Sequence, residues 1–414
     1  MPNPETISIK DFDYELPADK IAQFPLAERD ASKLLVYSQG RISQDIFSNI
    51  DAYLPANSLL VFNNTRVIRA RLIFRKQTGS RVEIFCLEPI APVREIQAAF
   101  QQQSASKWKC LVGNLKRWKS GSLVLESTLH GQVYQLFAEH TGDCGDGSHE
   151  ISFRWNPPGK RFSEILEIMG LIPLPPYINR PSELLDNERY QTIYADHDGS
   201  VAAPTAGLHF TDSVLTRLIS KGVEVEKVTL HVGVGTFRPV VAEQIGSHVM
   251  HHEKIVVRAD VIEHLLNNPG RPVFAVGTTS ARTMESLYWL GARLIREGPA
   301  CLPLVTQWEP YQANGTGTIT TAQSLEALLD FLQKNHLEEY SGETRLMIAP
   351  GYRYRLLSGL ITNFHMPQST LLLLVAALIG GNWKDAYDYA LSNGFRFLSY
   401  GDSCLFFNPV TELH

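Results

Sequence analysis

The chain has 414 residues, of which 44% are hydrophobic and 20% are charged, and its formal net charge is −5. This composition is ordinary for a soluble globular enzyme, and the length indicates two or three domains. The negative net charge excludes a strongly basic nucleic-acid binder, so any RNA-binding site must be a local patch of positive charge.

The five cysteines are widely spaced and form no C-x-x-C pair: Cys86, Cys110, Cys144, Cys301 and Cys404. Zinc and iron–sulfur sites need clustered thiolates, so we expect no metal and no disulfide framework. Residues 1–15 contain acids but no apolar core, which indicates no secretory signal. The longest apolar run, 371–379, is too short to span a bilayer and predicts a buried helix. We therefore expect a cytoplasmic protein.

Up to about residue 67 the chain mixes a helical patch with short strands. Residues 59–62 form an apolar run followed by Asn63, Asn64 and Thr65, which predicts a buried strand that ends in a turn. From 68 to 155, short β segments separated by glycines recur with almost no helical pattern. This predicts a small all-β antiparallel barrel over residues 68–155, inserted into an α/β domain of residues 1–67 and 156–414.

The part after residue 157 has the texture of an α/β domain. Thr211 is placed to cap a helix that runs to Lys221, with Gly222 as its stop. Residues 228–232 alternate as a strand does, and residues 273–276 form a strand that breaks into a helix through Leu290.

Two phrases of this domain combine a histidine with small residues. In the phrase 200–210, Thr205 and Gly207 allow close backbone approach to a ligand, and His209 lies near a helix start; a tight loop with a packed histidine is the alternative. In the phrase 229–239, alternation places His231 and Gly233 on one strand face. Gly233 and Gly235 do not complete G-x-G-x-x-G, so a bulge or turn is the alternative there.

Three further phrases lie at strand ends. In 277–283, hydroxyls and free N–H groups at a helix start suit an anion or a carboxylate, although capping alone also explains them; the residues are Thr278, Thr279, Ser280 and Arg282. In 360–370, Pro367 ends a strand and Ser369 or Thr370 caps a helix, which leaves Asn363 and His365 unexplained. The phrase 400–402, with Asp402, is by itself only a turn signal.

Two basic stretches contain no acid. The stretch 66–81 contains Arg66, Arg69, Arg71, Arg75, Lys76 and Arg81. The stretch 107–119 contains Lys107, Lys109, Lys116, Arg117 and Lys119 beside Trp108 and Trp118. Basic side chains among aromatic ones suit phosphate contact with base stacking. The alternative is a solvated barrel face with both tryptophans in the core.

In this order, the phrases resemble those of the S-adenosylmethionine:tRNA ribosyltransferase-isomerases of queuosine biosynthesis. The resemblance also includes 11–17, 29–35, 61–67, 190–195 and 395–402, so it covers nearly the whole chain. It implies an α/β domain with an inserted barrel, in a cytoplasmic, single-chain enzyme that needs no metal. The implied reaction transfers and isomerises the ribosyl group of S-adenosylmethionine onto 7-aminomethyl-7-deazaguanine at the tRNA wobble position, giving epoxyqueuosine and releasing adenine and methionine.

The implied chemistry needs a base that removes a proton from the carbon beside the sulfonium. The candidates are His209, His231 and His365, with Asp402 as an orienting group or base, and the histidines are not distinguished by sequence. Thr278, Thr279 and Ser280 are candidates to hold the methionine carboxylate of the donor. Arg238 and Arg282 are placed to contact that carboxylate or the RNA backbone.

The chain departs from the family pattern at a few positions. Asn64 replaces the usual aspartate, Arg69 a proline, and Leu357-Ser358 a Val-Asp pair, and the usual aromatic residue soon after Glu253 is missing. These changes leave a divergent paralogue with another acceptor as an alternative. A non-catalytic tRNA-binding protein is a second alternative, based on the basic stretches. A methyltransferase is a third, but the glycine-rich loop after a first strand is not found.

Overall fold

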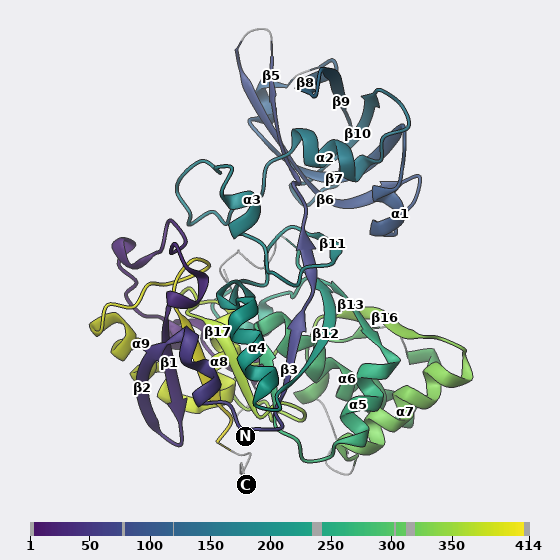
Figure 1. Cartoon of the computed structure of the whole chain (residues 1–414). Coiled ribbons are helices and arrows are strands. Elements are labelled where there is room, and N and C mark those ends of the chain that lie inside the picture. Colours follow the sequence, from purple (N-terminus) through teal and green to yellow (C-terminus); the bar gives the residue numbers. More distant parts are fainter. Residues whose placement is uncertain are drawn as a thin grey trace.

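The computed structural model describes residues 4–76, 79–118, 120–233, 242–301, 304–311 and 319–409. The structure consists of an α/β body and a β-barrel, and the barrel lies beyond the ends of the strands of the body's sheet (Figure 1). β4 (Thr65–Val67) leads the chain out of the body, and β11 (His197–Ser200), which returns to it, pairs with β4 in parallel. The predicted class, an α/β domain with a small inserted barrel, is confirmed.

The body is built on a mixed sheet whose described strands run in the order β15-β16-β13-β12-β3-β14-β17-β18-β1-β2. Their bounds are β1 (Lys33–Ser38), β2 (Arg41–Ile46), β3 (Leu59–Asn63), β12 (Glu224–His231), β13 (Glu253–Arg258), β14 (Val273–Val276), β15 (Leu304–Val305), β16 (Glu339–Thr344), β17 (Gly359–Asn363) and β18 (Ser403–Phe407). Strands β12, β3, β14 and β17 are parallel neighbours. Because β3 continues into β4, their carboxyl ends point toward the barrel (Figure 1).

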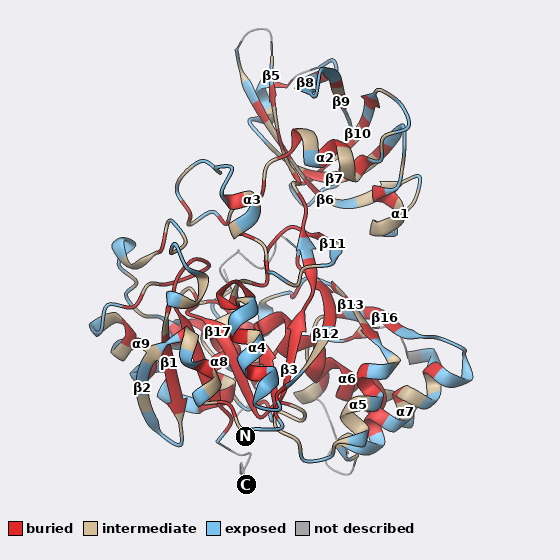
Figure 2. Ribbon diagram, in the orientation of Figure 1, coloured by how far each residue is buried: buried red, intermediate tan, exposed pale blue. Residues whose placement is uncertain are grey.

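Strand β3 is buried on both faces, as its apolar run predicts. Leu59 and Val61 pack into the core beneath the helices of one side, whereas Leu60 and Phe62 pack into a second core on the other side. Parallel strands covered by helices on both faces need apolar side chains at successive positions. The central strands β3, β14, β17 and β18 are accordingly buried at every position (Figure 2).

The helices cover both faces of the sheet, and in the body they are α4 (Asp212–Ser220), α5 (Ala259–Asn267), α6 (Thr278–Glu297), α7 (Thr321–Lys334), α8 (Thr370–Ile379) and α9 (Trp383–Ser392). Thr211 caps α4 by accepting a hydrogen bond from the N–H of Val214, and Gly222 follows the helix with φ of 91°. Ser369 caps α8 through the N–H of Leu372, and that helix is buried as predicted. Among the described residues, none of the helices combines the length and apolarity needed to cross a membrane.

The predicted end of α6 at Leu290 is wrong, because the helix continues to Glu297. Gly291, which resembles a stop signal, instead lets α7 approach closely. A Cβ atom at Gly291 would lie 1.9 Å from the carbonyl oxygen of Ser324. Here glycine serves helix packing rather than helix termination.

The barrel consists of β5 (Arg71–Arg75), β6 (Arg81–Ala91), β7 (Ala105–Gly113), β8 (Leu123–Leu129), β9 (Gln132–Asp143) and β10 (His149–Asn156). These antiparallel strands pair in the order β5-β6-β7-β10-β9-β8, and β5 also contacts β8, so the sheet curls nearly closed. The helices α1 (Ile96–Phe100) and α2 (Phe162–Met169) pack on it, and α3 (Asp186–Arg189) lies on the returning segment. The interval 68–155 stays our proposal for the inserted domain, and α2 contributes to the same core.

Trp108 and Trp118 lie in the barrel core, with 0% and 4% of their surfaces exposed. The ring N–H of Trp108 donates to Ser106 Oγ, and that of Trp118 donates to the carbonyl of Gly121. Rings enclosed in this way cannot stack on RNA bases. The alternative interpretation, tryptophans in the core of a solvated barrel, is the correct one for this pair.

Candidate functional site

A cavity of about 360 Å³ lies at the carboxyl ends of the parallel strands. Five of the predicted site residues line it, namely Thr205, Thr278, Thr279, Asn363 and His365. The remaining walls come from the returning segment at Pro176 and Tyr177 and from the turn that contains Leu398 and Ser399. Ligands of open α/β sheets bind at this edge, so this cavity is our candidate functional site.

The N-terminus of α6 opens into this cavity through Thr278 and Thr279. Gly277 precedes the helix with φ of 90°, a backbone conformation that favours glycine, and it has no side chain to cap the helix. Thr279 Oγ1 accepts a hydrogen bond from Asn63 Nδ2 at 3.2 Å. The unpaired N–H groups and the helix dipole make this end a favourable place for an anionic group.

Asn363 is 3% exposed and ends strand β17 at the cavity. Its Nδ2 donates to His209 Nε2 at 3.0 Å and to the carbonyl oxygen of Asp402 at 3.4 Å. Its Oδ1 is buried and has no hydrogen-bond partner among the described residues. A buried acceptor without a partner costs free energy, and a ligand N–H or O–H in the cavity would remove that cost.

His209 lies behind Asn363 and does not line the cavity. Its Nδ1 is 2.8 Å from Ser32 Oγ, and its ring packs against Phe47. Burial lowers the pKa of His209 to about 3, so the ring is neutral at neutral pH. Because Nε2 accepts from Asn363, the ring proton is on Nδ1 and is donated to Ser32.

The other two predicted histidines lie in different surroundings. His365 lines the cavity, with Nε2 3.0 Å from Thr362 Oγ1, and burial lowers its pKa to about 3. His231 ends β12 outside the cavity lining, with Nδ1 3.2 Å from Thr65 Oγ1, and burial lowers its pKa to about 4. Both rings are therefore neutral at neutral pH, because burial disfavours their charged forms.

Asp402 does not line the cavity either, and its carboxylate holds the turn 396–402. It accepts the backbone N–H of Lys33 at 3.1 Å and that of Arg396 at 2.8 Å, and burial raises its pKa. Within this turn Leu398 has φ of 70°, an uncommon conformation for a bulky residue. The hydrogen bonds of Asp402 hold this turn, and the turn places Leu398 and Ser399 against the cavity.

Several predicted donor-binding residues serve the packing of the protein. Ser280 Oγ donates to the carbonyl of Val276 at the end of β14, and Arg282 pairs with the buried Glu253. A Cβ at Gly207 would lie 1.9 Å from the hydroxyl oxygen of Tyr194, so this glycine makes room for that tyrosine. Gly233 is exposed and does not line the cavity. Gly235, Arg238 and Lys119 lie outside the described residues.

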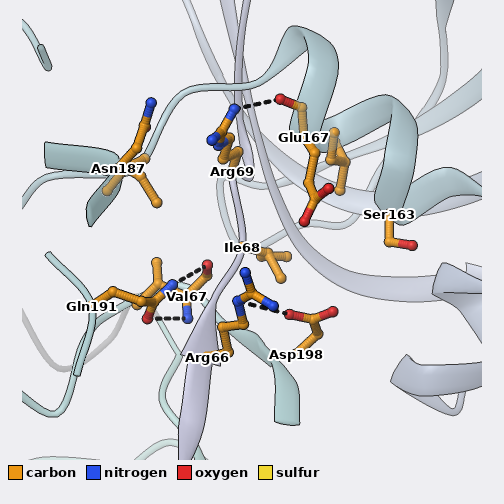
Figure 3. Close-up of a pocket in the computed structure, with 11 residues that line it drawn as sticks. Arg66, Val67, Ile68, Arg69, Ser163, Glu167, Asn187, Gln191 and Asp198 are labelled. Carbon is orange, nitrogen blue, oxygen red and sulfur yellow. Dashed lines mark hydrogen bonds and ion pairs between the residues drawn. The ribbon is translucent and has the colours of Figure 1, made fainter. Parts of the chain in front are cut away.

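The basic residues of the first stretch lie at the base of the barrel and along β5. Figure 3 shows Arg66 directed toward Asp198, at 3.9 Å, and Arg69 toward the carbonyl of Glu167, beside a small cavity of about 60 Å³. In the same cavity Gln191 exchanges two hydrogen bonds with the backbone of Val67, both 3.0 Å long. These contacts tie the barrel to the body.

The other predicted basic residues lie on the outside of the barrel. Arg71 pairs with Glu83 at 2.6 Å, and Lys109 pairs with Asp146 at 2.7 Å. Lys76 donates a hydrogen bond to the carbonyl of Arg117. Arg75, Lys116 and Arg117 are exposed. The contact between Lys76 and Arg117 thus brings the two basic stretches together at one place on the barrel.

Sequence reasoning missed Tyr177 and Ser399, whose hydroxyl oxygens are 2.6 Å apart in the cavity wall. Tyr177 follows a run of prolines in the segment that returns from the barrel. That run was the available signal, because proline-rich connections hold fixed conformations.

The departures from the family pattern lie outside the cavity lining. Asn64 Oδ1 accepts from Thr229 Oγ1 at 2.7 Å, a contact that a carboxylate oxygen would also make. Ser358 Oγ accepts from the N–H of Val273 at 3.3 Å. Ser358 precedes β17, at the end of the strand opposite Asn363.

Comparisons with known proteins agree over nearly the whole chain. A family model described as queuosine biosynthesis protein matches residues 9–406. The S-adenosylmethionine:tRNA ribosyltransferase-isomerase of Desulfitobacterium hafniense is 38% identical over 406 residues, covering 96% of this chain and 99% of the relative. The protein of the same name from Syntrophotalea carbinolica is 38% identical over 405 residues, with the same coverage. A crystal structure of an S-adenosylmethionine tRNA ribosyltransferase from Thermotoga maritima aligns with 29% identity and a TM-score of 0.45, covering 96% of this chain and 99% of that one.

Proposed function

The chain belongs to the queuosine biosynthesis protein family, and from this premise we propose that it is an S-adenosylmethionine:tRNA ribosyltransferase-isomerase. It transfers and isomerises the ribosyl group of S-adenosylmethionine onto 7-aminomethyl-7-deazaguanine at the wobble position of a tRNA. Epoxyqueuosine forms, and adenine and methionine leave. S-adenosylmethionine is thus a substrate, and a cytoplasmic location follows from the tRNA acceptor. We further infer that the chain acts as a monomer.

The observation that carries this proposal is the composition of the cavity wall. The N-terminus of α6 and Asn363, whose buried Oδ1 has no hydrogen-bond partner among the described residues, line the same space of about 360 Å³. One suits a carboxylate and the other suits an N–H or O–H donor. S-adenosylmethionine carries groups of both kinds, at its methionine end and on its ribose and adenine.

We assign the methionine carboxylate of the donor to the first turn of α6. Thr278 and Thr279 supply hydroxyls there, and the backbone N–H groups of that turn supply further donors. Thr205 also lines the cavity, in the phrase that precedes α4. Asn363 Oδ1 then receives a hydroxyl or amino hydrogen of the donor.

Of the three histidines, we assign the reacting position to His365, because it alone among them lines the cavity. Its ring is neutral, as a base must be before it removes hydrogen from the carbon beside the sulfonium, although the burial that keeps it neutral also weakens it as a base. His209 is a positioning residue that acts through Asn363. His231 lies beside β11, where the chain returns from the barrel, and we assign it to the side of the site nearest the RNA.

The basic residues on the barrel and at its base are our candidates for contacts with tRNA phosphates. They include Arg66, Arg69, Arg71, Arg75, Lys76, Lys109, Lys116 and Arg117. Each such contact is expected to add to the salt dependence of binding.

The proposal is tested by mixing the protein with S-adenosylmethionine and a tRNA that carries the aminomethyl precursor. Free adenine, free methionine and the mass of the tRNA are then measured. Release of both small molecules with a matching gain in tRNA mass supports the proposed reaction. Binding of tRNA without adenine release contradicts it and favours the non-catalytic alternative.

A further inference from the structure

A second and larger cavity lies against the outer face of the barrel. It has a volume of about 710 Å³ and is enclosed by strands β5, β6 and β7 on one side and the returning segment 171–182 on the other. Pro176 lines both this cavity and the candidate site. The two spaces therefore meet at this proline, and we call the larger one the barrel groove.

The floor of the barrel groove is partly apolar. Alternation along β5 places Leu72 and Phe74 in the barrel core and Ile73 on the outside, and the same alternation turns Phe85 of β6 outward. Ile73, Phe85 and Leu111 of β7 line the groove and are only half-buried. An aromatic ring and aliphatic side chains on an open surface provide flat contacts for an unstacked base.

The rim of the barrel groove is positively charged. Its lining includes three arginines, Arg71, Arg81 and Arg180, and one carboxylate, Glu83, and Arg180 is paired at 2.7 Å with Asp186, which does not line the groove. Glu83 is shared, because Arg71 binds it at 2.6 Å and Arg81 at 3.2 Å. One carboxylate cannot neutralise two guanidinium groups, so the barrel side of the groove attracts anions.

We propose that the barrel groove binds the unpaired anticodon-loop nucleotides that flank the modified base. This inference rests on the proposed function, which places that base in the neighbouring cavity. A base stacks on Phe85 and the aliphatic floor, and its phosphates meet Arg81 and Arg71. Sequence-specific proteins bind RNA loops in this way, through splayed bases and arginine planes rather than through paired stems.

The experiment compares Arg81→Glu and Phe85→Ala with a matched control, Arg154→Glu. Arg154 is an exposed arginine on β10 of the same barrel, and it does not line the groove. Each protein is titrated with a synthetic anticodon stem-loop at several salt concentrations, without S-adenosylmethionine. The KM values for the stem-loop and for S-adenosylmethionine are then measured separately.

Arg81→Glu is expected to weaken stem-loop binding about tenfold and to lower the salt dependence by about one phosphate contact. Phe85→Ala is expected to weaken binding without changing the salt dependence, and the KM for S-adenosylmethionine stays constant in both. The inference is overturned if both variants bind the stem-loop as tightly as Arg154→Glu does. If Phe85→Ala does not fold, Arg81→Glu alone tests the inference, because the Arg81 side chain is exposed and its replacement leaves the barrel core intact. A wild-type protein that binds RNA in the groove but releases no adenine would refute the proposed reaction and leave this surface standing.

Discussion

Asn363 donates an amide hydrogen to Nε2 of the buried His209 across 3.0 Å. The same nitrogen faces the carbonyl oxygen of Asp402, which can only accept a hydrogen bond. Both contacts thus require nitrogen at that position and leave Oδ1 as the amide atom without a partner among the described residues. The orientation of one amide oxygen is set by two residues that do not themselves line the site.

Replacing Asn363 with aspartate should remove both donated hydrogen bonds while keeping nearly the same shape. We expect kcat/KM for S-adenosylmethionine to fall by about a hundredfold, because two buried contacts of about 1–3 kcal/mol each are affected. The measurement is adenine release under steady-state conditions. Asn393→Asp is the control, since Asn393 is an exposed residue that donates to the carbonyl of Tyr389. Equal activities of the two variants would rule out the proposed role of Asn363.

The α6 helix offers a matched pair of hydroxyl deletions. Thr278→Val should raise the KM for S-adenosylmethionine about tenfold, because a hydroxyl that contacts a charged carboxylate contributes about 1.5–3 kcal/mol. Ser280→Ala should leave that KM unchanged, since Ser280 Oγ donates its hydrogen bond to the carbonyl of Val276 at the end of β14. The KM for tRNA serves as the internal reference. A larger increase in this KM for Ser280→Ala than for Thr278→Val would argue against a carboxylate-binding site at this end of the helix.

Stability should decrease with acid because the buried histidines resist protonation. The pKa of His209 falls from 6.5 to about 3 on burial, so below pH 6.5 the unfolded chain binds a proton that the folded chain does not. This difference lowers the free energy of unfolding as pH falls from about 6.5 toward 3, by about 2 kcal/mol near pH 5. Urea unfolding of His209→Gln should lack this portion of the pH dependence. An unchanged slope in that variant would show that His209 does not contribute.

Asp402→Ala should lower the free energy of unfolding by about 3 kcal/mol, because it leaves the N–H groups of Lys33 and Arg396 without their acceptor. Activity should fall as well, since the turn that carries Leu398 loses its anchor. Asp402→Asn keeps an amide oxygen as an acceptor, so its free energy of unfolding should fall less than that of Asp402→Ala. Asp388→Ala, on the exposed side of α9, is the control for removal of a carboxylate. Chemical unfolding monitored by circular dichroism gives the comparison.

The parts of the fold that depend on local pattern were predictable from the sequence. The double-sided burial of β3 follows from its apolar run, and the start of α4 follows from Thr211. The end of α6 was not predictable, because Gly291 is needed only where α7 crosses it. That requirement comes from a contact between helices distant in the sequence.

The candidate site was predictable in outline and not in detail. Thr278, Asn363 and His365 meet in one cavity, as their positions at strand ends indicate. His209 and Asp402 act through Asn363 and through the turn 396–402, because both residues lie outside the cavity lining. The spacing of residues in the sequence does not predict which of them line the cavity, since this depends on how loops from distant parts of the chain pack together.

The hydrogen bond between Tyr177 and Ser399 joins the segment that borders the barrel groove to the wall of the donor cavity. A ligand in the barrel groove and a ligand in the donor cavity would therefore contact opposite sides of the same segment. Linkage then works in both directions: any factor by which bound RNA changes the affinity for S-adenosylmethionine is the factor by which the donor changes the affinity for RNA. A Tyr177→Phe exchange removes this hydrogen bond, so coupling that runs through it is expected to be smaller in that variant than in the wild-type protein.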